Sequence, residues 1–154
     1  MQKIFTTCVT ATVLMLLCSC TGMPSQQEAA ETHDRFAAYA GEPVDHFTWL
    51  GRYDSWQAVG KNEVVVVTNP NEAYLLKVWP PCDMRTVTNR IGISSMGGSV
   101  SARTDSVTIE EPGMGRMSCP IEEIRKVNYR QMKADMRAEA VAARAARQQA
   151  QSAQ

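Results

Sequence analysis

The sequence predicts a mainly β protein: a small antiparallel sheet of five or six strands rolled into a barrel or sandwich, with a C-terminal α-helix. Two observations lead to this fold class. In residues 41–127, short runs of β-branched and aromatic residues are separated by Gly, Pro and Asn turn signals. Residues 128–154 contain no Gly or Pro and are rich in Ala, which is typical of a helix. We therefore expect residues 41–127 to form a β domain.

The first part of this domain predicts one half-buried strand and one hairpin. Apolar and polar residues alternate from Phe47 to Tyr53, with the period of two that a half-buried strand shows. The run Val64–Val67 is typical of a strand buried on both faces. The turn signal Asn69-Pro70-Asn71 separates this run from a second alternating segment, Ala73–Trp79. We expect these last two segments to pair as a hairpin.

The second part of the domain predicts shorter elements. Pro80-Pro81 ends the preceding strand. We then expect a short helical connection at Cys82–Val87 and two strands, Ile91–Ile93 and Val107–Ile109. A turn at Glu111–Gly115 and a last element at Pro120–Val127 complete the domain. A domain of this size buries only a marginal core, so a covalent cross-link matters for its stability.

Length and charge limit the class of protein. The chain has 154 residues, with 16 Lys+Arg balanced by 16 Asp+Glu. This length fits one modest domain with appendages and excludes two large domains. Proteins that bind nucleic acid over most of their surface usually carry many more basic than acidic residues, so we expect no nucleic-acid partner. The charge is nevertheless uneven, because residues 125–154 carry 7 basic and 2 acidic side chains.

The N-terminus predicts a secretory signal over residues 1–19. A positive start is followed by the uncharged run Ile4–Leu17, which is shorter than the about 20 residues that a membrane-spanning helix needs. The run ends in Leu17-Cys18-Ser19-Cys20, which resembles the bacterial lipobox. This resemblance implies cleavage before Cys20, a diacylglycerol thioether on its sulfur and a further acyl chain, such as palmitate, on its new amino group. The alternative is an ordinary signal peptide in which the cysteines are incidental.

The lipid on Cys20 predicts a location in the cell envelope. Each buried methylene contributes about 0.8 kcal/mol, so two or three acyl chains anchor a protein essentially permanently. Thr21 follows the cysteine, whereas Asp at that position is the common signal for retention in the inner membrane. The resemblance therefore implies a lipoprotein of the outer membrane that faces the periplasm. Residues 20–40 predict a flexible tether with one helical turn around Arg35–Tyr39.

The remaining cysteines predict a disulfide. Cys8 and Cys18 leave with the signal and Cys20 takes the lipid, so only Cys82 and Cys119 remain. In an oxidising periplasm two such cysteines are expected to pair, and closing a loop of about 40 residues stabilises the fold by about 4 kcal/mol. The rival interpretations are a reactive thiol pair or a metal site. Neither histidine shows ligand-like spacing to the cysteines, so we expect no metal and no cofactor.

The C-terminal segment, residues 128–154, predicts a basic Ala-rich helix with a frayed tail. Helical spacing places Tyr129, Met132, Met136, Ala140 and Ala143 on one face. It places a basic set on an adjacent face: Lys126, Arg130, Lys133, Arg137 and Arg144. One interpretation is a solvated helix that docks weakly through its methionines. The other is a basic surface that binds an anionic envelope component, such as lipid phosphates or cell-wall carboxylates.

Six segments of the middle zone form an ordered set: Gly41–Phe47 (GEPVDHF), Ala73–Val78 (AYLLKV), Pro81-Cys82, Ile91–Ile93 (IGI), Asp105–Ile109 (DSVTI) and Cys119–Arg125 (CPIEEIR). Together they resemble the family of unknown function numbered 6491, small secreted or lipid-anchored proteins of proteobacteria. The similarity spans about residues 41–127 and leaves out the basic tail. It implies no activity and no catalytic or binding residues.

The sequence contains few residue patterns typical of a catalytic site, and we predict no catalytic residue. Asp45-His46 is a conceivable acid/base pair, but neighbours in a strand point to opposite faces. The acidic pairs Glu110-Glu111 and Glu122-Glu123 are expected to be solvated rather than to share a cleft. Four aromatic residues are expected to fill the core, with a sugar-binding groove as the alternative: Trp49, Tyr53, Trp56 and Trp79.

These observations favour an uncharacterised, lipid-anchored envelope protein that faces the periplasm and serves as a non-enzymatic binding or envelope-maintenance module. The alternative is a hydrolase that acts on cell-wall or lipid substrates, with a site assembled from distant residues. A deep polar pocket around His46 would favour the hydrolase, and a filled barrel without a cleft would count against it. The sequence leaves the oligomeric state open.

Overall fold

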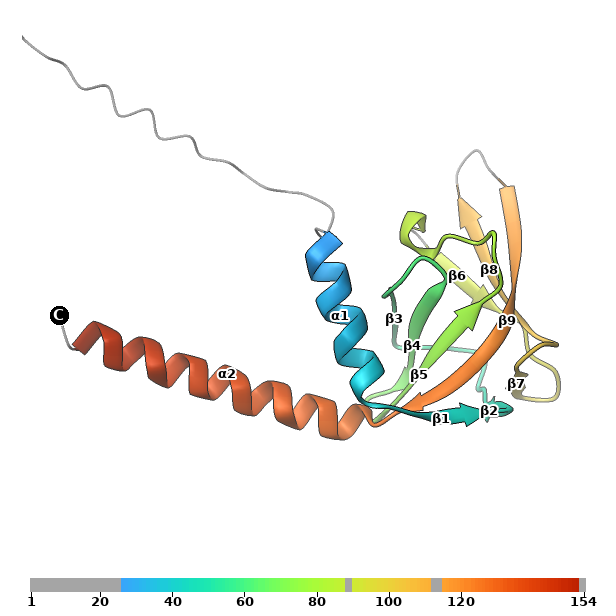
Figure 1. Ribbon diagram of the computed structural model, residues 1–154. Coiled ribbons are helices and arrows are strands. Elements are labelled where there is room, and N and C mark those ends of the chain that lie inside the picture. Colours follow the sequence, from blue (N-terminus) through green and yellow to red (C-terminus); the bar gives the residue numbers. More distant parts are fainter. Residues whose placement is uncertain (1–25, 88–89, 112–114, 153–154) are drawn as a thin grey trace, which may run out of the picture.

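The structure is a computed structural model that describes residues 26–87, 90–111 and 115–152 (Figure 1). The helices are α1 Gln26–Ala38 and α2 Tyr129–Ser152, and a short 3-10 helix lies at Met84–Thr86. The strands in chain order are β1 Ala40–Val44, β2 His46–Thr48, β3 Ser55–Ala58, β4 Glu63–Asn69, β5 Glu72–Val78, β6 Arg90–Ile93, β7 Ser99–Ser101, β8 Ser106–Glu111 and β9 Gly115–Val127.

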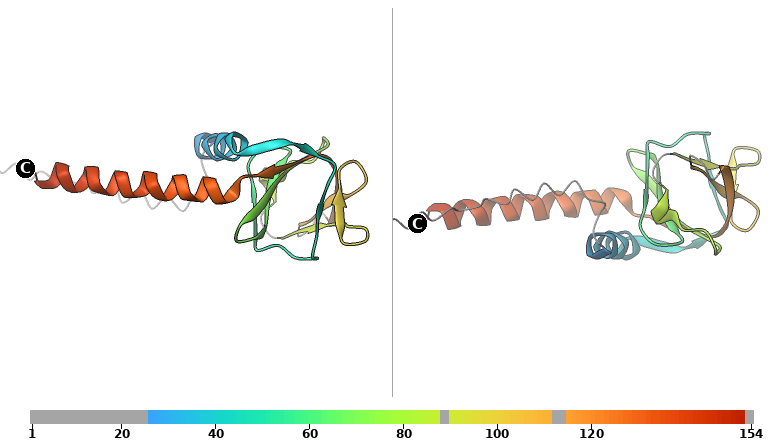
Figure 2. Two further views of the ribbon diagram at one scale, coloured as in Figure 1. Left: turned by 90° about the horizontal axis from the view of Figure 1, so that it is seen from below. Right: turned by 90° about the horizontal axis from the view of Figure 1, so that it is seen from above.

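The main sheet is antiparallel, with the strand order β3-β4-β5-β9-β8-β6. It curls into a half-barrel whose strands surround a common interior (Figure 2). β1 pairs with the last part of β9, and β2 and β7 form a separate two-stranded sheet. The predicted fold class, a mainly β protein with a rolled antiparallel sheet and a C-terminal helix, is confirmed.

Strand β4 is buried on both faces, as the run Val64–Val67 predicts. Its even-numbered valines belong to the core inside the half-barrel, whereas its odd-numbered valines belong to a second cluster outside it. This second cluster, which we call the helix-side cluster, joins the sheet to the two helices through Phe36 of α1 and Met132 of α2. Its buried members are Phe36, Val59, Val65, Val67, Ala73, Leu75, Val127 and Met132. Strands that are covered on both sides read as continuous apolar runs, which explains the sequence pattern.

The predicted hairpin is confirmed. β4 pairs with β5 in antiparallel register from Glu63 opposite Lys77 to Asn69 opposite Glu72. The side chain of Asn69 accepts a hydrogen bond from the backbone N–H of Asn71 at 3.0 Å. Such a bond from an Asx side chain to the backbone two residues on stabilises a tight turn.

Two predicted strand boundaries are wrong. β2 ends at Thr48 rather than near Tyr53, because Gly51 has a φ of 75°, a left-handed conformation that interrupts an extended chain. The last strand begins at Gly115 rather than Pro120, because its first six residues pair with β8. Residues 112–114, which make up most of the turn predicted at Glu111–Gly115, lie outside the described residues. Three short strands were not predicted from the sequence: β1, β3 and β7.

A helix of 13 residues, α1, occupies much of the segment for which the sequence predicts a flexible tether with one helical turn. Phe36 is 8% exposed and anchors the helix in the helix-side cluster. Phe36 is the large apolar side chain of α1 that is buried, so its burial contributes to holding the helix on the sheet. The first part of the expected tether, residues 20–25, lies outside the described residues.

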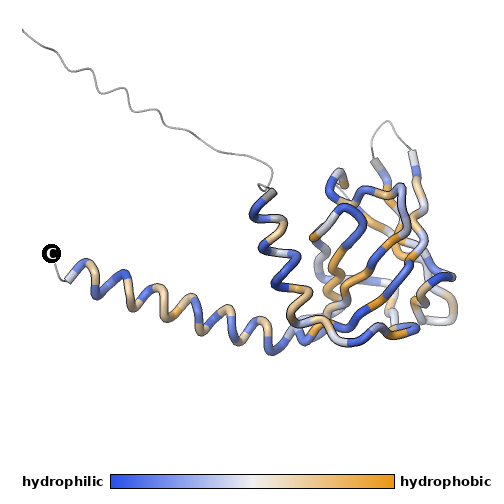
Figure 3. The backbone as a smooth tube through the Cα atoms, in the orientation of Figure 1, coloured by the Kyte–Doolittle hydropathy of each residue, from blue (hydrophilic) through white to orange (hydrophobic). Residues whose placement is uncertain are grey.

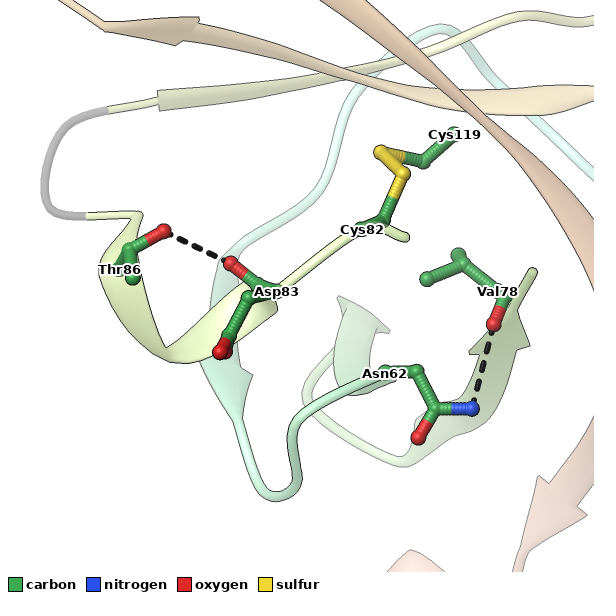
Figure 4. The surroundings of a disulfide bond; sticks show 6 residues. All are labelled: Asn62, Val78, Cys82, Asp83, Thr86 and Cys119. Atoms are coloured by element: carbon green, nitrogen blue, oxygen red, sulfur yellow. Dashed lines mark hydrogen bonds between the residues drawn. A yellow bond between two sulfur atoms is a disulfide. The ribbon is translucent and has the colours of Figure 1, made fainter. Parts of the chain in front are cut away.

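Cys82 and Cys119 form a disulfide, with their Cα atoms 6.0 Å apart (Figure 4). Both cysteines are buried, and the bond joins the connection after β5 to the middle of β9. Hydrogen bonds flank it: the Asn62 side chain donates to the Val78 carbonyl at 3.3 Å, and the Thr86 hydroxyl donates to the Asp83 carbonyl at 2.8 Å. The predicted disulfide is confirmed.

We predict that Cys82→Ala/Cys119→Ala lowers the free energy of unfolding by about 4 kcal/mol, because the bond closes a loop of nearly 40 residues in the unfolded chain. Urea unfolding followed by circular dichroism measures this change. Wild type with reductant is expected to unfold at the lower midpoint of the double variant, and the double variant should not respond to reductant. A wild-type midpoint that reductant leaves unchanged would contradict the prediction.

Candidate functional site

The helix α2 projects from the half-barrel and is its most prominent surface feature (Figures 1 and 2). Asn128 caps the N-terminus of the helix, since its side chain accepts a hydrogen bond from the N–H of Gln131 at 3.4 Å. Met132 is 3% exposed in the helix-side cluster, but all residues of α2 from 136 to 152 are exposed. Apolar and polar residues alternate along this part of the helix (Figure 3). Only the first two turns of α2 therefore pack on the domain.

The junction between the two helices is held by polar contacts as well as by apolar packing. The Tyr39 hydroxyl donates to the Asp135 carboxylate at 2.6 Å, and the N–H of Asn128 donates to the Tyr39 carbonyl at 2.8 Å. The hydrogen bond to Asp135 raises the pKa of Tyr39. Together with Phe36 and Met132, these bonds hold the end of α1 against the start of α2.

The structure divides the predicted basic face into two groups. Lys126 lies in β9 rather than on the helix, because β9 continues to Val127 in order to pair with β1 and β5. Its ammonium is 2.8 Å from a carboxylate oxygen of Glu72. Lys133 donates to the Pro70 carbonyl and lies 4.7 Å from the centre of the Tyr129 ring. Both lysines are thus engaged with the domain.

The other three members of the basic face are free of such contacts. Arg130, Arg137 and Arg144 are exposed, and none of them forms an ion pair within the part of the chain that the structure describes. They share one side of α2, as helical spacing predicts. We call these three arginines, which follow one line along α2, the arginine stripe; Arg147, also exposed, lies about 60° around the helix from Arg144.

An open cleft of about 470 Å³ surrounds His46, just after the C-terminal end of β1. Its polar lining includes Asp45, Arg103 and Glu122, and all but one of its lining residues are exposed or half-buried. Arg103 has a φ of 70°, in a turn whose backbone is held by Asp105, which accepts from the N–H of Ser101 at 2.8 Å. The cleft is therefore polar but open, rather than a deep pocket.

Sequence reasoning missed a second polar group beneath α1. His33 places Nε2 2.9 Å from a Glu63 oxygen and Nδ1 3.1 Å from an Asp34 oxygen. A cavity of about 260 Å³ beside it is also lined by Lys77 and Arg125. The sequence gives no signal for this group, because His33 lies 30 residues before Glu63 in a segment that resembles a tether.

Three of the four acidic side chains noted in the sequence form ion pairs with basic residues. Glu110 pairs with Arg116, Glu122 is 3.2 Å from Lys77, and Glu123 pairs with Arg125.

Within the described ranges, no group of three or more His, Cys, Asp or Glu side chains could hold a metal ion. No described helix is long and apolar enough to cross a bilayer. The proposed lipidation site, Cys20, lies outside the described residues.

The four aromatic residues do not line a common groove. Trp49 is buried with Phe47, which stacks on Tyr74 with the ring centres 4.1 Å apart. Tyr53 and Trp56 pack at the border of the same core, whereas Trp79 is 50% exposed. Most of these side chains therefore fill the half-barrel, as expected for a small β domain.

A model described as a family of unknown function, DUF6491, matches residues 2–151. The chain belongs to this family. Membership in DUF6491 confirms the resemblance of the middle zone, and the match extends beyond residues 41–127 to include both helices. No curated protein and no solved structure matches the chain significantly.

We predict that Glu72 makes stability depend on pH on the acid side. The hydrogen bond from Lys126 holds the pKa of Glu72 below its usual value, and bonds from Tyr74 and Asn69 act in the same direction. A carboxyl whose pKa is lower in the folded state contributes stability above its unfolded pKa and loses it as pH falls through its folded pKa. Glu72→Gln should therefore be less stable than wild type at neutral pH and converge with it in acid.

Urea midpoints measured from neutral pH down to the acid range test this expectation. Glu42→Gln is the matched control, because it removes an exposed carboxylate that forms no ion pair in the described part of the chain. A constant difference between wild type and Glu72→Gln at every pH would contradict the prediction.

Proposed function

We propose that this protein is a lipid-anchored component of the bacterial cell envelope. Acyl chains on Cys20 hold it at the outer membrane, and its β domain faces the periplasm as a binding or envelope-maintenance module rather than as an enzyme. Membership in a family of unknown function is consistent with this proposal but assigns no activity.

The order of features at the N-terminus carries the proposal. An uncharged apolar run leads directly into Leu17-Cys18-Ser19-Cys20, so a small residue precedes a cysteine at the expected end of a signal. The disulfide supports an oxidising compartment, because buried disulfides persist outside the cytosol and are rare within it. The two observations are independent, since one concerns residues 1–20 and the other the folded domain.

The arrangement of polar groups supports a non-enzymatic role. Catalytic carboxylates need an environment that separates their pKa values, whereas Glu110, Glu122 and Glu123 each have a basic partner at the surface. His46 is exposed and forms no hydrogen bond or ion pair with another described residue. A general acid or base is normally held in place by such a contact.

We predict that Cys20→Ala abolishes the incorporation of labelled palmitate, because the thioether forms on that sulfur. Cys18→Ser is the matched control: it also removes a cysteine from the signal, but it leaves the acylated residue and should incorporate label as wild type does. Intact mass spectrometry provides the second measurement. A wild-type chain that is unmodified and still begins at Met1 would overturn the proposal.

The cleft around His46 favours one second candidate, a hydrolase of cell-wall or lipid substrates. Under the main proposal, a soluble chain that starts at Thr21 releases no product from purified cell wall or phospholipid. Turnover that His46→Ala stops, while the variant keeps the wild-type unfolding midpoint, would establish the hydrolase instead.

A further inference from the structure

The arginine stripe has the dimensions of a binding site for an extended ligand. Arg130, Arg137 and Arg144 are seven residues apart, so successive side chains drift by only about 20° around the helix. At a rise of about 1.5 Å per residue, the stripe is about 20 Å long. The other two cations of the predicted basic face, Lys126 and Lys133, contact the domain instead of extending this line.

The stripe lies on the side of α2 that faces away from α1. Asp135 and Met132 hold the end of α1, through Tyr39 and the helix-side cluster respectively. At about 100° per residue, these two residues lie about 160° and 140° around the helix from Arg137. In Figure 2 α1 is seen almost end-on beside the first part of α2, so the two helices run in different directions.

The proposed anchor at Cys20 precedes α1, on which the stripe does not lie. Five residues lie between Cys20 and Gln26, so the two are at most about 20 Å apart, and α1 adds about 20 Å before it reaches α2. In the proposed lipid-anchored protein the lipid therefore attaches before the start of α1, and the stripe lies on the side of α2 away from α1. Helices that lie on bilayers usually insert Trp, Phe or Leu, and residues 137–152 contain none of these.

We propose that the arginine stripe binds the carboxylates of an extended cell-wall polymer on the side of the domain away from the anchoring membrane. This inference rests on the proposed location in the periplasm. Guanidinium groups bind carboxylates through two parallel hydrogen bonds, which suits a line of arginines to a polymer that carries repeated carboxylates. The long, straight stripe suits a chain-like ligand better than a small molecule.

Co-sedimentation with purified, insoluble cell wall tests the proposal. The probe is the chain that starts at Thr21, which contains every described helix and strand. Arg137→Gln/Arg144→Gln removes two positive charges from the stripe. The matched control, Ala138→Glu/Ala145→Glu, changes the net charge by the same amount on exposed positions about 100° away around the helix. Circular dichroism checks that both variants keep the wild-type helix content.

The Arg→Gln variant is expected to bind the cell wall about fivefold more weakly, as two lost exposed ion pairs imply, while the control binds like wild type. Binding should also weaken as salt rises and when the carboxylates of the cell wall are converted to amides. Equal loss in both variants, or unchanged binding to amidated cell wall, would overturn the proposal. So would tighter binding to phosphatidylglycerol vesicles than to cell wall. Because this probe carries no lipid, its result is independent of acylation at Cys20.

Discussion

Strand β9 is the element on which the rest of the fold depends. Its 13 residues pair with β8 in their first part and with β5 and β1 in their last part. It also carries Cys119 and leads directly into α2. Because one strand joins the two halves of the curled sheet, the register of β9 sets the positions of the disulfide, the cleft around His46 and the start of the projecting helix.

Much of the fold follows from the sequence because burial leaves a pattern there. Val64–Val67 predicts a strand covered on both sides, and the second cover is the pair of helices. Short strands such as β1 and β3 leave no such pattern, since their residues are mostly exposed or half-buried and depend on pairing with a longer neighbour. The helix α1 leaves a weak pattern for a related reason: it has one buried large side chain, Phe36, in an otherwise polar and Ala-rich segment, which resembles a tether.

The candidate site was only partly predictable. Helical spacing places Arg130, Arg137 and Arg144 on one side of α2, where they are exposed, but it also assigns Lys126 to that face because the sequence does not show that β9 continues to Val127. The group around His33 depends on contacts between residues distant in sequence, which no local pattern reports. By contrast, counting cysteines was enough to predict the pairing of Cys82 with Cys119.

The packing of α2 by its first two turns has an evolutionary consequence. No buried side chain lies beyond Met132 in the described part of the helix, so insertion or deletion near its end leaves the core unchanged. Each added turn would carry the tip about 5.4 Å further from the domain at little cost in folding stability. The far part of the helix can thus change in length while the domain stays the same.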